Sequence, residues 1–219
     1  MVDFWTVAGK RTYGDQCGIA RALDVVGERW ALLVVRELLL GPKRFTDLRA
    51  GLPHVSPDVL SQRLRQLEDD GVVRRRTLPP PAASQVYELT DRGQELEPVV
   101  LALGRWGSRA PFPAGHEPLG VDALVLALKT LYRPDRADGL ISSSFELRLG
   151  EDRFHARLDN GRLEVSRGAA AHPLATIDTD SGTLQQILWH GHPLTTEALS
   201  ITGDQQAAVQ FLTLFPLPE

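Results

Sequence analysis

The sequence predicts an α+β fold made of two domains, and three observations support this. Apolar residues recur at helical spacing through most of the first 110 residues, whereas beyond about residue 140 they alternate with polar residues, as in strands. A segment rich in Pro and Gly, residues 111–120, separates the two patterns. We therefore expect one domain at residues 1–110, a linker at 111–119 and a second domain at 120–219.

The composition is that of an ordinary folded chain whose charge divides between its halves. Residues 1–110 carry a net charge of +2 and the remainder −6, which gives −4 for the chain. A nearly neutral first half permits nucleic-acid binding without demanding it. No apolar run approaches the ~18 residues that a membrane span needs, and the first residues lack the basic segment of a signal peptide. We therefore expect a cytoplasmic protein without membrane contact.

Four short helices open the first half. Apolar residues at 19, 23 and 26, and again at 30, 33, 34 and 38, mark two of them before Gly41 and Pro42; a third follows at 45–50. Ser56 is a preferred N-cap residue and Pro57 suits the first position of a fourth helix. Leucines at 60, 64 and 67 form its core stripe, and Gly71 is placed to end it in a left-handed cap. We expect this helix at about 57–70.

A hairpin and a further helix follow. Residues 72–78 and 86–89 read as strands joined by a loop that contains three consecutive prolines. Thr90 and Asp91 can cap a last helix. Its apolar stripe, which needs a partner, consists of Leu96, Val99, Val100, Leu103 and Trp106.

This order of elements is that of a winged helix-turn-helix, whose second helix enters the major groove of DNA. The side of the fourth helix opposite its leucines carries Gln62 and Arg65, residue types that pair bidentately with adenine and guanine. Arginines on the same side would contact phosphates. For each arginine taken alone, the alternative is that it is an ordinary solvated surface residue. The candidate DNA-binding residues are Arg44, Ser56, Pro57, Asp58, Ser61, Gln62, Arg63 at the edge of the exposed face, Arg65, Arg74, Arg75 and Arg76.

Residues 13–107 resemble the winged helix-turn-helix regulators of the HxlR type, relatives of MarR. The resemblance lies in Gly27-Glu-Arg-Trp30, Gly41-Pro-Lys-Arg-Phe45, the run from Leu60 to Gly71, and Val86-Tyr-Glu-Leu-Thr90. It implies a homodimer that binds double-stranded DNA at a pseudo-palindromic operator. The candidate dimer residues are Ile19, Leu23, Leu96, Val99, Leu103 and Trp106.

Cys17, the single cysteine, excludes an internal disulfide and a zinc site with several thiolates. Some relatives use the cysteine at this position as a redox sensor, although members often have Pro where Gly18 follows here. Sensing needs a partly exposed thiolate, which Arg21 one helical turn later would favour. The alternative that we favour is a small, buried apolar residue at the dimer contact.

The sequence of the second half predicts both helices and strands, which alternate irregularly along the chain. A helix starts at Val121, strands are expected at 145–149, 154–158, 163–165, 175–179 and 199–201, and Asp180 or Ser181 and then Asp204 can cap two more helices. We expect one antiparallel sheet with helices on one face.

Catalytic chemistry is not expected in this half. His155, His172, His190 and His192 fall on different elements, and no nucleophile stands in a known motif. We expect no enzyme activity, no metal and no cofactor.

Residues 120–217 resemble sterol-carrier-protein-like domains, through Phe145-Glu-Leu-Arg-Leu, Ala175-Thr-Ile-Asp-Thr-Asp180 and Leu199-Ser-Ile-Thr-Gly-Asp204. In that family the sheet and helices enclose an apolar tunnel, which implies an apolar small-molecule effector. The alternative is that the same residues fill a small core. The pocket candidates are Phe145, Leu147, Leu188, Trp189, Phe211 and Phe215.

Together these features predict a homodimeric transcriptional regulator controlled by an apolar effector. The alternative is a lipid or small-ligand binding protein that uses its helix-turn-helix only to dimerise.

Overall fold

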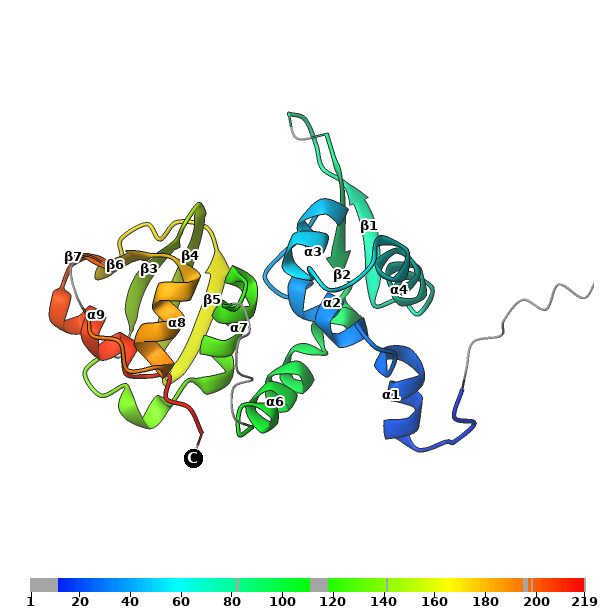
Figure 1. The fold of residues 1–219 in the computed structure, drawn as a ribbon, viewed down its shortest axis with the longest axis horizontal. Helices are drawn as coiled ribbons and strands as arrows, with labels where there is room; N and C mark the ends of the chain where they lie inside the picture. Colours follow the sequence, from blue (N-terminus) through cyan, green and yellow to red (C-terminus); the bar gives the residue numbers. More distant parts are fainter. Residues whose placement is uncertain are drawn as a thin grey trace, which may run out of the picture.

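The computed structural model describes residues 12–81, 83–110, 118–140, 142–194, 197 and 199–218. Its buried apolar residues form two clusters, one within the first half and a second made of residues of the second half together with Leu40. Figure 1 shows the elements of the two halves side by side. The first half contains α1 (Gly18–Val26), α2 (Ala31–Leu38), α3 (Phe45–Gly51), α4 (Pro57–Asp69), β1 (Val73–Thr77), β2 (Gln85–Leu89), α5 (Asp91–Gln94) and α6 (Glu97–Gly107). The second contains α7 (Val121–Leu131), the 3-10 turn η1 (Pro134–Arg136), β3 (Ser143–Leu149), β4 (Asp152–Asp159), β5 (Arg162–Arg167), β6 (Ala175–Thr179), α8 (Ser181–Trp189), β7 (Ser200–Gly203) and α9 (Gln205–Leu212).

Most of the expected linker, residues 111–117, lies outside the described residues. Within the described part of the chain, every helix is too short or too polar to cross a lipid bilayer.

Helix α4 begins and ends where its local sequence predicts. The Ser56 hydroxyl accepts a hydrogen bond from the backbone N–H of Val59 at 3.4 Å. At the other end Gly71 has φ +68°, a left-handed conformation that glycine adopts without a steric cost. Leu60, Leu64 and Leu67 between these ends are fully buried. The helix is therefore fixed on the first cluster along its leucine stripe.

The single helix expected after the hairpin is instead two, α5 and α6. Thr90 caps the first, because its hydroxyl accepts the N–H of Gly93 at 3.1 Å. The chain breaks at Glu95 and Leu96 because Pro98 follows. In a continuous helix the proline ring would clash with the carbonyl of Gln94, four residues earlier, and would leave that carbonyl without its donor. The helix restarts with Pro98 in its first turn.

The five-stranded sheet has the order β5-β4-β3-β6-β7 and is mixed, so the expectation of a wholly antiparallel sheet is wrong. Strands β3 and β6 run parallel, while the other pairs are antiparallel. The cause is the segment between β5 and β6. It starts with Gly168 bonded to the Arg153 carbonyl and ends with Leu174 bonded to the Ser144 carbonyl, at the first residues of β3. The chain thus recrosses the sheet before β6 begins.

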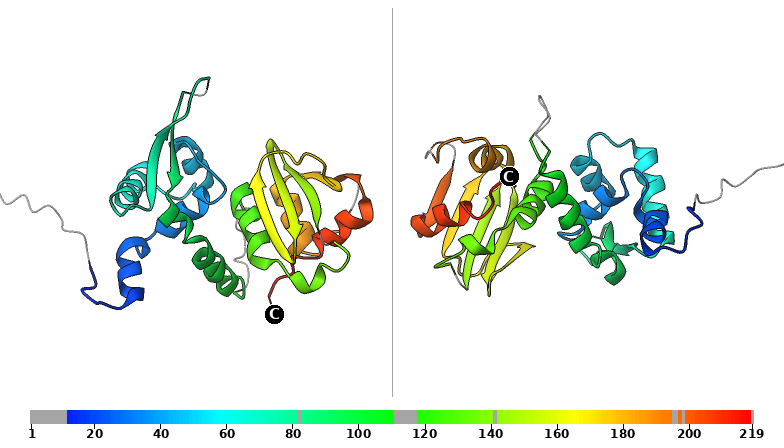
Figure 2. Two further views of the ribbon diagram at one scale, coloured as in Figure 1. Left: turned by 180° about the vertical axis from the view of Figure 1, so that it is seen from behind. Right: turned by 90° about the horizontal axis from the view of Figure 1, so that it is seen from below.

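Helices α7, α8 and α9 cover one face of this sheet. Leu128 of α7, Leu184 of α8 and Phe211 of α9 share one cluster with Phe145 and Leu147 of β3. Helix α7 lies on the side of the second half that faces the first, where it contacts α2, α3 and α6 (Figures 1 and 2).

Candidate nucleic-acid interface

The leucine-free side of α4 is open to solvent. Asp58, Gln62 and Arg65 are exposed and Ser61 is half-buried, while Ser56 and Pro57 are exposed where the helix begins. Among the residues that the structure describes, no hydrogen-bond or ion-pair partner holds Gln62 or Arg65. Both side chains can therefore reach an external partner without first breaking a contact.

Arg63 differs from its expected place at the edge of the exposed face, because it is only 7% exposed. Its Nη2 lies 3.4 Å from Glu28 Oε2, and its Nη1 donates to Gln66 Oε1. One helical turn separates Arg63 from the buried Leu60 and Leu67, so the long side chain runs along the packed surface. Its position favours a role in joining α4 to the segment between α1 and α2.

The three arginines of the hairpin are exposed but paired. Arg74 and Arg76 each place Nε 2.8 Å from a carboxylate oxygen of Glu88 on β2, and Arg75 lies 3.0 Å from Glu68 of α4. The cross-strand register, with Arg74 opposite Glu88, explains the first pair. The arginine side chains are 47–64% exposed, so a phosphate can approach them from solvent, whereas Glu88 is only 11% exposed and would be left without a cation if both arginines moved away.

Arg44 links the helix-turn-helix to the hairpin. Its Nε donates to Ser84 Oγ at 3.1 Å, and the backbone of the preceding Lys43 pairs with that of Tyr87. The Asp47 carboxylate accepts the Arg44 backbone N–H at 3.0 Å and so fixes the start of α3. Sequence reasoning missed Ser84, since nothing local ties residue 44 to residue 84.

Helices α1 and α6 project from the end of the first half opposite the hairpin tip (Figure 1). They carry large apolar side chains in contact with water: Ile19 is 72% and Trp106 71% exposed, and none of the α6 residues, all described, is buried. Leu96 differs from the other dimer candidates because it packs partly buried against the first cluster. The exposed members of the set are Ile19, Leu23, Val99, Leu103 and Trp106.

Cys17 is exposed in the single chain, at the position before α1. Its backbone N–H is held by Asp15 Oδ1 at 2.9 Å. In a single copy of the chain, this exposure differs from the alternative favoured above, in which Cys17 is a small buried residue at the dimer contact.

The aromatic pocket candidates of the second half fill a core instead of lining a tunnel. Phe145, Leu147, Phe211 and Phe215 are at most 1% exposed. The rings of Phe145 and Phe211 stack with centroids 4.4 Å apart, and Phe211 meets Phe215 edge-on at 5.1 Å. Leu188 and Trp189 lie half-buried at the margin of this cluster. Of the six candidates, Trp189 alone lines the pocket that lies between the two halves.

The histidines remain dispersed. His155 Nε2 and Ser144 Oγ share a hydrogen bond of 2.8 Å on the sheet. Within the described ranges, no three side chains of His, Cys, Asp or Glu gather as a metal site would require.

Comparison with known proteins bears on the first half. Residues 25–112 match the HxlR-like helix-turn-helix family. The chain is 40% identical over 88 residues to YvaP of Bacillus subtilis (strain 168), an uncharacterized HTH-type transcriptional regulator; the match covers 40% of this chain and 82% of YvaP. The HTH-type transcriptional regulator sll1512 of Synechocystis sp. is 39% identical over 95 residues, covering 43% and 70%.

A solved structure titled "Redox regulator HypR in its oxidized form" is 34% identical, with 44% of this chain and 100% of that chain covered and a TM-score of 0.40. The match to YvaP covers 82% of that relative, and the residues that match the family model, 25–112, run from the end of α1 through α6. The chain belongs to the HxlR-like helix-turn-helix family of transcriptional regulators.

Proposed function

We propose that this regulator acts as a homodimer on a pseudo-palindromic operator, each copy laying α4 in a major groove. The observation that carries the proposal is the open side of α4, where Gln62 and Arg65 are exposed and without an internal partner. Each residue can pair bidentately with a base edge, Gln with adenine and Arg with guanine. These two residues would supply sequence preference.

Phosphate contacts would come from Arg44 at the start of α3 and from Arg74, Arg75 and Arg76 of β1. Their present partners, Ser84, Glu68 and Glu88, are on the same hairpin or on α4. Each arginine has further N–H donors that can bind a phosphate from the solvent side without releasing Ser84, Glu68 or Glu88, so the wing can dock with little rearrangement. Such contacts position the protein and make binding sensitive to salt.

The apolar side chains of α1 and α6 would form the dimer contact. Two copies related by a twofold axis would bury the same patch on each. This would remove from water Ile19, Leu23, Val99, Leu103 and Trp106, which are five of the large apolar residues exposed in the described part of the chain.

The test of DNA reading starts with selection of preferred duplexes from a random library by the purified full-length protein. We expect the double variant Gln62→Ala, Arg65→Ala to lose the preference, since each bidentate pair is worth about 1–3 kcal/mol of discrimination. A matched control is Arg162→Ala, which removes an exposed arginine from β5, remote from α4. An unchanged duplex profile in the double variant would refute the assignment. Failure of the wild type to select any duplex would favour the ligand-binding alternative.

We further propose a domain division into residues 1–110, a linker at 111–119 and residues 120–219, with a cytoplasmic location for the protein. We also propose that the last domain is of the sterol-carrier-protein-like type. The order of elements after residue 120, with three helices on one face of the sheet, supports this. An apolar effector would have to bind outside the filled aromatic core of the second domain, and mass spectrometry of natively purified protein would detect one that co-purifies.

A redox role for Cys17 stays a secondary proposal, supported by the exposure of its thiol. The gel shift decides it: DNA release that is unaffected by diamide or peroxide contradicts the role.

A further inference from the structure

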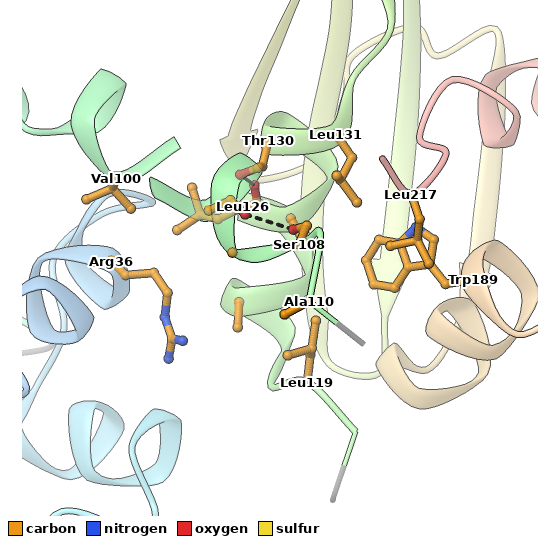
Figure 3. Close-up of a pocket in the computed structure, with 14 residues that line it drawn as sticks. Arg36, Val100, Ser108, Ala110, Leu119, Leu126, Thr130, Leu131, Trp189 and Leu217 are labelled. Atoms are coloured by element: carbon orange, nitrogen blue, oxygen red, sulfur yellow. Dashed lines mark hydrogen bonds between the residues drawn. The ribbon is translucent and has the colours of Figure 1, made fainter. Parts of the chain in front are cut away.

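We propose that the pocket between the two halves binds an uncharged, apolar small molecule. The pocket has a volume of about 420 Å³ and lies between α6 and α7, with Trp189 and Leu217 forming its far wall (Figure 3). This volume is within the range of small-molecule sites in proteins, roughly 300–1,000 Å³. Neither the aromatic core of the second half nor the open side of α4 contributes to it.

Small and apolar residues from both halves form the lining. Val100 and Gly104 come from α6, and Ala123, Leu126 and Ala127 come from α7. Figure 3 shows Leu126 and Thr130 of α7 between Val100 on one side and Trp189 and Leu217 on the other. The two alanines are half-buried, so methyl groups face space that a larger side chain could occupy.

The hydrogen-bond donors of Ser108, Thr130 and Trp189 in the wall are already used within the protein, which limits the chemistry of the occupant. Ser108 Oγ donates to the Gly104 carbonyl at 2.8 Å, and Thr130 Oγ1 donates to the Leu126 carbonyl at 2.7 Å. Trp189 Nε1 donates to the Phe215 carbonyl at 2.9 Å. A charged or strongly polar ligand would lose its hydration here without gaining equivalent bonds. An apolar molecule has no such cost.

Arg36, the one charged residue among the described residues of the lining, does not change this conclusion. Arg36 donates from Nε and Nη2 to Glu37 Oε1, at 3.2 and 2.8 Å. Its charge is thus compensated within α2, and an anionic ligand would have to compete with Glu37. An uncharged ligand leaves the pair intact.

The pocket adjoins the helix that carries the proposed dimer surface. Val100, Gly104 and Gly107 line the pocket, whereas Val99, Leu103 and Trp106 on the same helix are exposed. Helices α6 and α7 meet closely at Gly104, where an added Cβ would lie 3.2 Å from Thr130 Cγ2. A ligand seated beside this contact would favour one angle of α6 over another. This step rests on the homodimer of the proposed function: a change in the angle of α6 would couple ligand binding to the spacing of the two α4 helices.

The test uses the fluorescent, uncharged probe N-phenyl-1-naphthylamine with the full chain. We expect saturable binding to the wild type and at least a tenfold higher Kd in Ala127→Phe, whose ring would occupy the pocket. Val209→Phe is the matched control, because it adds the same ring at a 39% exposed position of α9 and leaves the pocket unchanged. Ala123→Phe provides a second pocket variant. The melting temperature of each variant establishes that it is folded.

Equal probe affinity in the folded pocket variants and in Val209→Phe would overturn the proposal, as would absence of probe binding to the wild type. A gel shift on the same samples separates this result from the proposed function. Probe binding without DNA binding would overturn the regulator mechanism and support the pocket. DNA binding without probe binding would overturn the pocket alone.

Discussion

Glu146 is a carboxylate that is only 3% exposed, on the side of the sheet away from the helices. It is covered because the segment between β5 and β6 recrosses the sheet there: the Ala170 N–H donates to its Oε2 at 3.0 Å. Arg148 Nε donates to its Oε1 at 2.6 Å. The hydrogen bond from Arg148 holds the pKa of Glu146 below its ordinary value, against the opposing effect of burial.

Glu146→Gln should lower the free energy of unfolding at pH 7 by about 1.5–3 kcal/mol, since it weakens hydrogen bonds to a charged group. A folded-state pKa below the unfolded value means that this stabilisation is present above about pH 4.3 and is lost as the pH falls. Urea unfolding of the wild type and of Glu146→Gln from pH 7 to pH 3 should therefore show that the difference in their free energies of unfolding decreases as the pH falls. The control is Glu164→Gln, which removes an exposed carboxylate paired with Arg157 and should have a far smaller effect. A gap that stays constant with pH would contradict the role of the charge.

Helices α1 and α6 provide a test at the scale of whole elements. Leu103→Glu introduces a charge into a side that is exposed in the single chain, so the fold should be little affected, within about 0.5 kcal/mol. In a symmetric dimer the same change places a carboxylate of each copy in the buried contact, and we expect the dimer Kd to rise at least tenfold by sedimentation equilibrium. DNA affinity should fall in parallel.

Leu174→Glu is the matched control, since Leu174 is a leucine of similar exposure (41% against 49%) in the second half. If both variants dimerise as the wild type does, α6 is not the dimer contact.

Elements with complete local signals could be predicted from the sequence, whereas those that depend on distant contacts could not. For α4, Ser56, the leucine stripe and Gly71 act within one helix, and they placed its bounds within a residue. The parallel β6 depends on where Leu174 meets Ser144, thirty residues away in the chain. Pro98 is a local signal for the break between α5 and α6. The continuous apolar stripe favoured a single helix in spite of this signal.

The same distinction applies to the candidate site. Exposure of Gln62 and Arg65 follows from helical periodicity, and the structure agrees with it. Arg63 is buried because its side chain runs along the packed surface toward Glu28, a contact that periodicity within α4 cannot reveal. Nor could composition distinguish a tunnel from a filled core, because the stacking of Phe145 on Phe211 depends on how α9 packs on the sheet.

At the scale of the whole molecule, a group of buried charges joins the two halves. Lys43, which follows α2, places Nζ 2.5 Å from Glu37 of α2 and 2.5 Å from Asp122 of α7. The two carboxyl residues are 2% and 4% exposed. Arg36 also bonds Glu37, and Arg167 also bonds Asp122. Lys43 is thus the cation shared between a carboxylate of the first half and one of the second.

Lys43→Met should leave these two carboxylates facing each other without the shared cation. Because each keeps one arginine, we expect a loss of about 1.5–3 kcal/mol, that of a hydrogen bond to a charged group, rather than the larger cost of an isolated buried charge. Lys129→Met is the control: Lys129 of α7 pairs with Glu97 of α6 and so also joins the two halves, but that carboxylate is 32% exposed. Urea unfolding followed by tryptophan fluorescence measures both losses. A double-mutant cycle with Asp122→Asn should give a coupling of at least about 0.5 kcal/mol, since the two residues are in contact. If the losses are additive, or if Lys43→Met costs no more than Lys129→Met, the halves are held together by their apolar contacts and not by this group of charges.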